Sequence, residues 1–174
     1  MRDSVLLFLA ATASIVLQLA IAPCIEILGA MPNFVLVFVG VAAMFRPSDS
    51  MMVVGFGVGM AYDLVSSGTP GVMAALLSLV AFCASRASMR LGNDTLSVSL
   101  LITMAASLLV EVCYALFFVT MTEVSLLDAL LVRALPCALY DCAVCLIVLP
   151  LLAAAFARGA SVRIPPESST IRLR

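Results

Sequence analysis

The chain has 174 residues, of which 64% are hydrophobic and only 11% are charged. An ordinary soluble domain is roughly 45–50% apolar and about 25% charged, so this composition excludes a soluble globular protein and predicts one embedded in a lipid bilayer. The net charge is −1, and every cation is an arginine because the sequence contains neither lysine nor histidine. Lysine and histidine catalysis and histidine metal ligands are therefore excluded.

Prolines, glycines and polar clusters divide the apolar sequence into six segments, each of which we expect to form a transmembrane helix. Crossing the hydrocarbon core takes about 20 residues of α-helix, so six spans account for most of the chain. The first segment is longer than the roughly 7–15 apolar residues of a secretory signal, which favours a membrane span. In chain order, the predicted spans cover residues 5–22, 33–45, 50–66, 71–88, 96–121 and 130–156.

The arginines indicate how these spans are oriented. An even number of spans places both termini on one side of the membrane, and all arginines except Arg133 fall on that side. Loops rich in arginine are cytoplasmic as a rule, so both termini are predicted to be cytoplasmic. We therefore expect an all-α polytopic membrane protein with a single six-helix domain over residues 1–160. A flexible cytoplasmic tail is expected over residues 161–174.

The most informative short motif lies in the third span. Gly55 and Gly59 form a GxxxG pair, and Asp63 follows four residues later on the same helix face. Glycines on such a face let a second helix approach closely, either within this chain or in a partner protein. The stretch lacks the lysine of a phosphate-binding loop, which argues against a nucleotide site. The predicted helix-packing or partner interface consists of Gly55, Gly57, Gly59 and Asp63.

Three charged residues in the last two spans form a second candidate site. Glu111 lies near the middle of the fifth span, and Arg133 and Asp141 share one face of the sixth. A charged group at the centre of a bilayer costs at least about 2.5 kcal/mol, so these residues need partners, water or a proton. We expect Glu111, Arg133 and Asp141 to form one buried polar cluster in the outer half of the bundle. The cluster either holds helices together or forms a functional pocket, and snorkelling of the side chains to the interface is a third interpretation.

Neither candidate site contains the combination of side chains that catalysis requires. No nucleophile with a neighbouring base stands near the carboxylates, so general acid/base catalysis lacks support. The six cysteines lie in apolar segments, where free cysteine behaves as a small buried hydrophobe, and neither a disulfide framework nor a zinc site is expected. We expect no enzymatic activity, no cofactor, no metal and no nucleic-acid partner.

Several short motifs, taken in their order along most of the chain, resemble the rod shape-determining protein MreD family. They are Leu17-Gln18 in the first span with Pro23 directly after it, Pro32-Asn33 at the start of the second, Gly55-Phe56, Gly59 and Asp63 in the third, Gly68 and Gly71 at the start of the fourth, and Leu135-Pro136 with Leu139-Tyr140-Asp141 in the last.

This resemblance implies a non-enzymatic component of the bacterial cell-elongation machinery in the cytoplasmic (inner) membrane. Such a protein binds the bitopic protein MreC and, through it, MreB and the peptidoglycan synthases, and it helps organise lateral peptidoglycan synthesis and rod shape. The resemblance also implies a six-helix fold similar to the substrate-binding subunits of energy-coupling-factor transporters. An alternative function follows from that fold, namely a vitamin-type substrate-binding subunit of a transporter, with the polar cluster in its ligand pocket.

Overall fold

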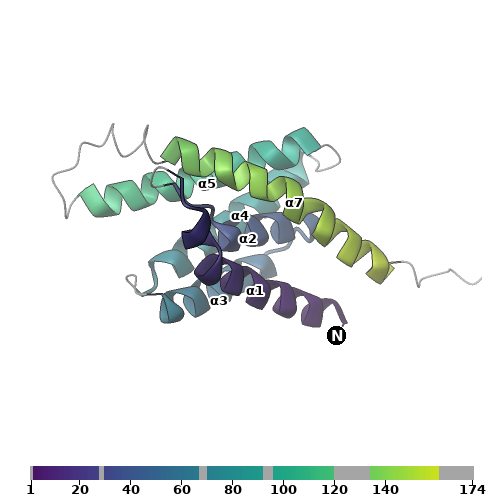
Figure 1. Ribbon diagram of the computed structural model, residues 1–174. Helices are drawn as coiled ribbons and strands as arrows, with labels where there is room; N and C mark the ends of the chain where they lie inside the picture. Colours follow the sequence, from purple (N-terminus) through teal and green to yellow (C-terminus); the bar gives the residue numbers. More distant parts are fainter. Residues whose placement is uncertain (1, 28–29, 67–69, 92–95, 120–133, 161–174) are drawn as a thin grey trace, which may run out of the picture.

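The computed structural model describes residues 2–27, 30–66, 70–91, 96–119 and 134–160, and these residues form six α-helices and no strand (Figure 1). The prediction of an all-α fold is therefore confirmed. The helices are α1 (Arg2–Ala20), α2 (Phe34–Phe45), α3 (Ser50–Val65), α4 (Val72–Leu91), α5 (Leu96–Val119) and α7 (Leu135–Ala160), with a short 3-10 helix, η1 (Ala22–Ile25), after α1.

Helix α2 lies at the centre of the bundle and contacts each of the other five α-helices. It has 12 residues, and all of those from Val35 to Met44 are buried. Valine is a weak helix former because its branched side chain loses rotamer freedom in a helix. The stability of α2 therefore comes from burial of its entire circumference against its neighbours, and the protein core is built around it.

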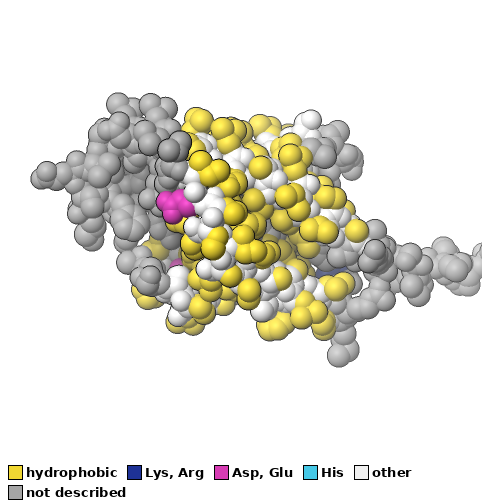
Figure 2. Space-filling model, in the orientation of Figure 1, with side chains coloured by type: hydrophobic (Ala, Val, Ile, Leu, Met, Phe, Trp, Pro, Cys, Tyr) yellow, Lys and Arg dark blue, Asp and Glu magenta, His cyan; other side chains and the backbone are white. Residues whose placement is uncertain are grey.

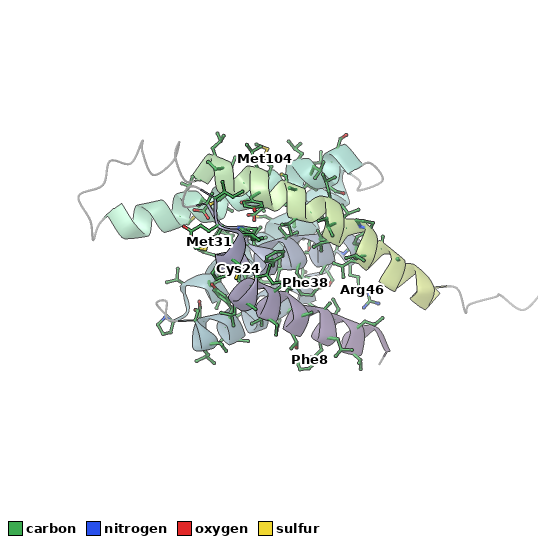
Figure 3. The ribbon with its side chains drawn as sticks, in the orientation of Figure 1. Phe8, Cys24, Met31, Phe38, Arg46 and Met104 are labelled. Atoms are coloured by element: carbon green, nitrogen blue, oxygen red, sulfur yellow. The ribbon has the colours of Figure 1, made fainter. Side chains whose placement is uncertain are left out.

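Successive helices run in opposite directions along the bundle, so the start of α1 and the end of α7 lie at the same end (Figure 1). Arg46, the C-cap residue directly after α2, lies at this end, whereas Cys24 and Met31 lie toward the other (Figure 3). Arg90, in the last turn of α4, also belongs to the end that holds Arg46. We call this end the arginine-rich end, defined by Arg46, Arg86 and Arg90.

Large hydrophobic side chains cover the outside of the bundle. The face formed by α1 and α7 is mostly hydrophobic (Figure 2), and Phe8, Val53 and Leu139 are 71%, 73% and 55% exposed. In the described part of the chain, two helical stretches, Val72–Leu91 and Leu135–Ala154, are long and apolar enough to cross a membrane, and four shorter apolar helices accompany them. An exposed apolar surface this extensive is unusual for a soluble monomer.

The end of α1 differs from the end of the first predicted span, at a proline. The first predicted span extends to residue 22, but α1 ends at Ala20 and the chain turns into η1, which has Pro23 in its first turn. Proline has no N–H to continue an α-helix, which accounts for the break. The last predicted span begins at residue 130, and within the described residues α7 begins at Leu135, directly before Pro136. Residues 130–133 lie outside the described part of the chain.

Candidate functional site

Side chains from separate parts of the chain cap the buried N-terminus of α2. The N–H of Asn33 donates to Asp141 Oδ1 at 2.6 Å, and the N–H of Phe34 donates to Gln18 Oε1 at 2.7 Å. The N–H of Leu36 donates at 3.0 Å to Oδ1 of Asn33, the N-cap residue. The first N–H groups of a helix have no acceptor within the helix, and each costs free energy if it is buried without one. These hydrogen bonds supply acceptors for three of the N–H groups.

Asp141 also connects this cap to α5. Only 1% of Asp141 is exposed, and its second carboxylate oxygen accepts a hydrogen bond from Ser107 Oγ. A carboxylate at a helix N-terminus interacts favourably with the helix dipole, which helps to offset the cost of burying Asp141. The neighbouring Tyr140 donates from its hydroxyl to the carbonyl of Ile25 in η1 at 2.8 Å. The α2 cap, as we call it, consists of Gln18, Asn33, Ser107 and Asp141.

Only part of the predicted Glu111, Arg133 and Asp141 cluster is described by the structure. Glu111 follows Ser107 by one turn of α5, is half-buried, and interacts electrostatically with Asp141. Arg133 lies outside the described residues. The partners that Asp141 contacts through hydrogen bonds are Asn33 and Ser107, and the sequence interpretation assigned neither of them to the cluster.

Two residues of the α2 cap that the sequence interpretation did not assign, Asn33 and Gln18, can be recognised as candidates from the sequence. Asn33 directly precedes an apolar run, which is the position of a helix N-cap. Gln18 is an isolated amide in the apolar sequence of α1, where a polar group needs a partner. Ser107 carried no such signal, because a serine in a helix can satisfy its own hydroxyl with a backbone carbonyl one turn earlier.

Asp63 caps a different helix. Its Oδ2 accepts from the N–H of Gly71 at 2.8 Å and from the N–H of Ala74 at 3.1 Å, at the start of α4. Gly71 has a φ of +93°, a left-handed conformation that glycine adopts without a steric penalty. Asp63 is only 4% exposed. Its described hydrogen bonds therefore join α3 to α4 and do not reach Asp141.

Gly55 and Gly59 lie against the backbone of α4. A Cβ on Gly55 would come within 2.6 Å of the Leu77 carbonyl oxygen, and one on Gly59 within 2.5 Å of the Ala74 Cα. No larger residue fits at either position unless α3 and α4 move apart. Gly57 differs from them, since a Cβ there would meet nothing within 4 Å. The structure thus brings Gly55, Gly59 and Asp63 together against α4 and turns Gly57 outward.

The cysteines include one CxxC pair, Cys142 and Cys145 on α7, and all six are free. Both thiols of the pair approach α5: Cys142 Sγ lies 3.8 Å from the Leu100 carbonyl oxygen and Cys145 Sγ lies 3.3 Å from Thr103 Oγ1. Among the described residues, no three His, Cys, Asp or Glu side chains gather in a way that could hold a metal ion. The pair contributes to the packing of α7 on α5.

No curated protein and no solved structure gives a significant match to this chain. The expected similarity to the substrate-binding subunits of energy-coupling-factor transporters therefore stays a prediction, and the transporter alternative gains no support. The family model described as rod shape-determining protein MreD matches residues 2–158, which include the whole α2 cap and the contact of α3 with α4. That family consists of membrane proteins of the cell-shape machinery and is not a known enzyme family. The chain belongs to the rod shape-determining protein MreD family, and this membership indicates a role in rod shape determination.

Proposed function

We propose that this chain is a non-enzymatic, multi-pass component of the bacterial cell-elongation machinery, which binds an MreC-like bitopic protein and helps organise lateral peptidoglycan synthesis. The family match over residues 2–158 carries this proposal. Through the MreC-like protein, the chain is connected indirectly to MreB and to the peptidoglycan synthases. It resides in the cytoplasmic membrane with six spans and with both termini in the cytoplasm.

The short central helix α2 and its capped N-terminus support insertion into a bilayer. Helix α2 has 12 residues and is therefore about 18 Å long, shorter than the hydrocarbon core of about 30 Å. Non-helical backbone at membrane depth is tolerated only where protein covers it and satisfies its polar groups. The α2 cap provides such cover, because Gln18, Asn33 and Asp141 supply acceptors for the N–H groups at this helix end.

The hydrogen-bonding state of the buried polar groups supports a structural role over ligand binding. Both carboxylate oxygens of Asp141 already accept hydrogen bonds from the chain itself. In the described residues, no buried side-chain nitrogen or oxygen lacks a hydrogen-bond partner. A pocket for a polar small molecule would present convergent polar groups that are free to bind it. The α2 cap instead uses its polar groups to fix four helices to one another.

We place the contact with the MreC-like protein on the outer face of α3. Gly55, Gly59 and Asp63 are already engaged by α4, whereas Gly57 is exposed and has open space above it. Val53, one turn before Gly57, is 73% exposed and adds apolar surface to the same face. A glycine on an exposed face of a transmembrane helix lets a partner helix approach to backbone distance.

The decisive experiment combines depletion with co-purification. Depleting the chain in its own rod-shaped host should produce rounded cells, and the wild-type chain should restore the rods and co-purify with the MreC-like protein. Gly57→Leu should accumulate normally but retain much less of that partner. Ala13→Leu is the matched control on the exposed face of α1 and should retain it fully. Rods that persist after depletion would contradict the function, and equal recovery of partner by the two variants would contradict the placement on α3.

A further inference from the structure

An apolar groove of about 300 Å³ lies between α4 and α5. Small side chains create it, because Ala84 and Ala87 of α4 face Ala105 and Ala106 of α5 where larger residues would close the gap. Two leucines at its rim, Leu91 and Leu101, are each 62% exposed, so the groove opens to the outside of the bundle. A cavity of this chemistry offers water no hydrogen-bond partner, which favours an apolar occupant.

The groove runs toward the arginine-rich end, where Arg90 is available to bind an anion. Its lining extends to Leu91, the last residue of α4. Arg90 follows the lining residue Cys83 by seven residues, two helical turns, so both lie on the same side of α4. Arg90 is exposed, and it forms no ion pair with a described residue.

Arg86, one turn before Arg90, is engaged elsewhere. Its guanidinium lies 2.9 Å from Asp49 Oδ1, at the start of α3, and 5.2 Å from the ring centre of Phe82. This ion pair leaves Arg90 as the described cation of α4 that is free to meet a negative charge at the groove.

We propose that the groove binds an acyl chain of an anionic phospholipid and that Arg90 holds the phosphate of its headgroup. Basic residues at the cytoplasmic ends of transmembrane helices hold anionic headgroups in this way. An α-helix with its side chains is about 10–12 Å across and would remain mostly outside a groove of this volume, whereas part of a much thinner acyl chain can lie in it. The proposal rests on the proposed insertion in the membrane with the arginine-rich end in the cytoplasm.

Tryptophan fluorescence tests the proposal, since the chain contains no tryptophan of its own. Leu101→Trp places a reporter at the rim of the groove, and Phe8→Trp places a control on the exposed surface of α1. Both variants are reconstituted as full-length chains in vesicles that contain either brominated phosphatidylglycerol or brominated phosphatidylcholine, and quenching by the bromine atoms reports contact with each lipid. The groove should favour phosphatidylglycerol about fivefold, the ratio that corresponds to roughly 1 kcal/mol for one arginine near an anionic membrane surface. The α1 reporter should show little preference.

Replacing each arginine in turn by glutamine shows which of them causes the preference for phosphatidylglycerol. In the Leu101→Trp background, Arg90→Gln should abolish the preference for phosphatidylglycerol, whereas Arg86→Gln should leave most of it intact. Equal quenching of Leu101→Trp by the two lipids, or equal losses in the two arginine variants, would overturn the proposal. Quenching of the α1 reporter alone would mean that a protein segment fills the groove, which overturns the proposal and leaves membrane insertion standing. Absence of quenching in both reporters would contradict insertion itself.

Discussion

Asp141 of α7 accepts a hydrogen bond from the backbone N–H of Asn33, 108 residues earlier in the chain, at 2.6 Å. This contact joins the last helix of the bundle to the first residues of its central helix. The same carboxylate accepts from Ser107 on α5, so one buried side chain fixes the relative positions of α2, α5 and α7. The packing of α2 among its neighbours therefore depends on a polar residue as well as on apolar burial.

Replacing Asp141 should destabilise the protein to a degree that depends on how many hydrogen bonds the new side chain can accept. Asparagine keeps one oxygen for the Asn33 N–H and presents an amide group to Ser107. Leucine accepts nothing, so the N–H of Asn33 loses its acceptor, which costs about 1–3 kcal/mol. The Ser107 hydroxyl then has only a backbone carbonyl of its own helix as an acceptor. We expect wild type to be the most stable, Asp141→Asn to be intermediate and Asp141→Leu the least stable when purified protein is unfolded by titration with a denaturing detergent.

The control for this series is Leu139→Ala, a truncation on the same helix at a position that is 55% exposed. It should change the unfolding midpoint little, because Leu139 contributes less to the core. If Asp141→Leu unfolded at the same detergent concentration as wild type, the α2 cap would have no role in stability.

The two carboxylates near helix starts illustrate what the sequence can and cannot predict. Asp63 and Asp141 both stand out in the sequence as acids in apolar segments, and both are buried as that position requires. The partners of Asp63 are 8 and 11 residues away, within one helix–turn–helix unit, so they follow from the local chain direction. The partner of Asp141 on α2 depends on which helices are neighbours in three dimensions. The sequence offers no such information about distant helices, which is why the predicted cluster did not include Asn33.

The glycines of α3 also show the difference between what residue spacing predicts and what depends on which helices are neighbours. The GxxxG spacing predicts that Gly55 and Gly59 lie on one face, because residues four apart are adjacent on a helix surface. Residue spacing says nothing about which neighbour that face meets, and α4 proves to be the one that approaches it. Gly57, two residues from each of them, necessarily points elsewhere. Its inclusion in a single interface with Gly55 and Gly59 therefore has no basis in the packing within this chain.

Two alanine substitutions on α3 should differ in their effect on stability. In Gly59→Ala the new methyl group would lie 2.5 Å from the Ala74 Cα, which forces α3 and α4 apart. Overpacking of this kind costs about 1–3 kcal/mol. In Gly57→Ala the methyl group meets open space, and alanine is the better helix former by up to about 1 kcal/mol. The detergent-unfolding midpoint should fall for Gly59→Ala and stay level or rise for Gly57→Ala. Similar midpoints for the two variants would be incompatible with the close contact between α3 and α4.

The proposed topology predicts the behaviour of reporter fusions. A fluorescent protein fused after Arg174 should be fluorescent in the cytoplasm, and alkaline phosphatase inserted at Ser125 should be active outside it. The physical reason is the arginine distribution, since burying or translocating arginine is costly and arginine-rich loops stay inside. Each site should be inactive with the opposite reporter, which serves as the control. A cytoplasmic reporter that is active at Ser125 would contradict the six-span arrangement.

The place of Arg133 in the predicted cluster with Glu111 and Asp141 can be tested by a double-mutant cycle. Glu111 is half-buried on α5, one turn after Ser107, which donates to Asp141, so the two acids belong to the same apolar region. Two negative charges in such surroundings repel each other, and a nearby arginine would stabilise both. Arg133→Leu alone should therefore lower the detergent-unfolding midpoint, and adding Glu111→Gln should recover part of the loss because the excess negative charge is removed. Coupling between the two changes is read as the departure from additivity. Strictly additive effects would mean that Arg133 does not neutralise Glu111, and the same cycle with Asp141→Asn would then test Asp141 as its partner.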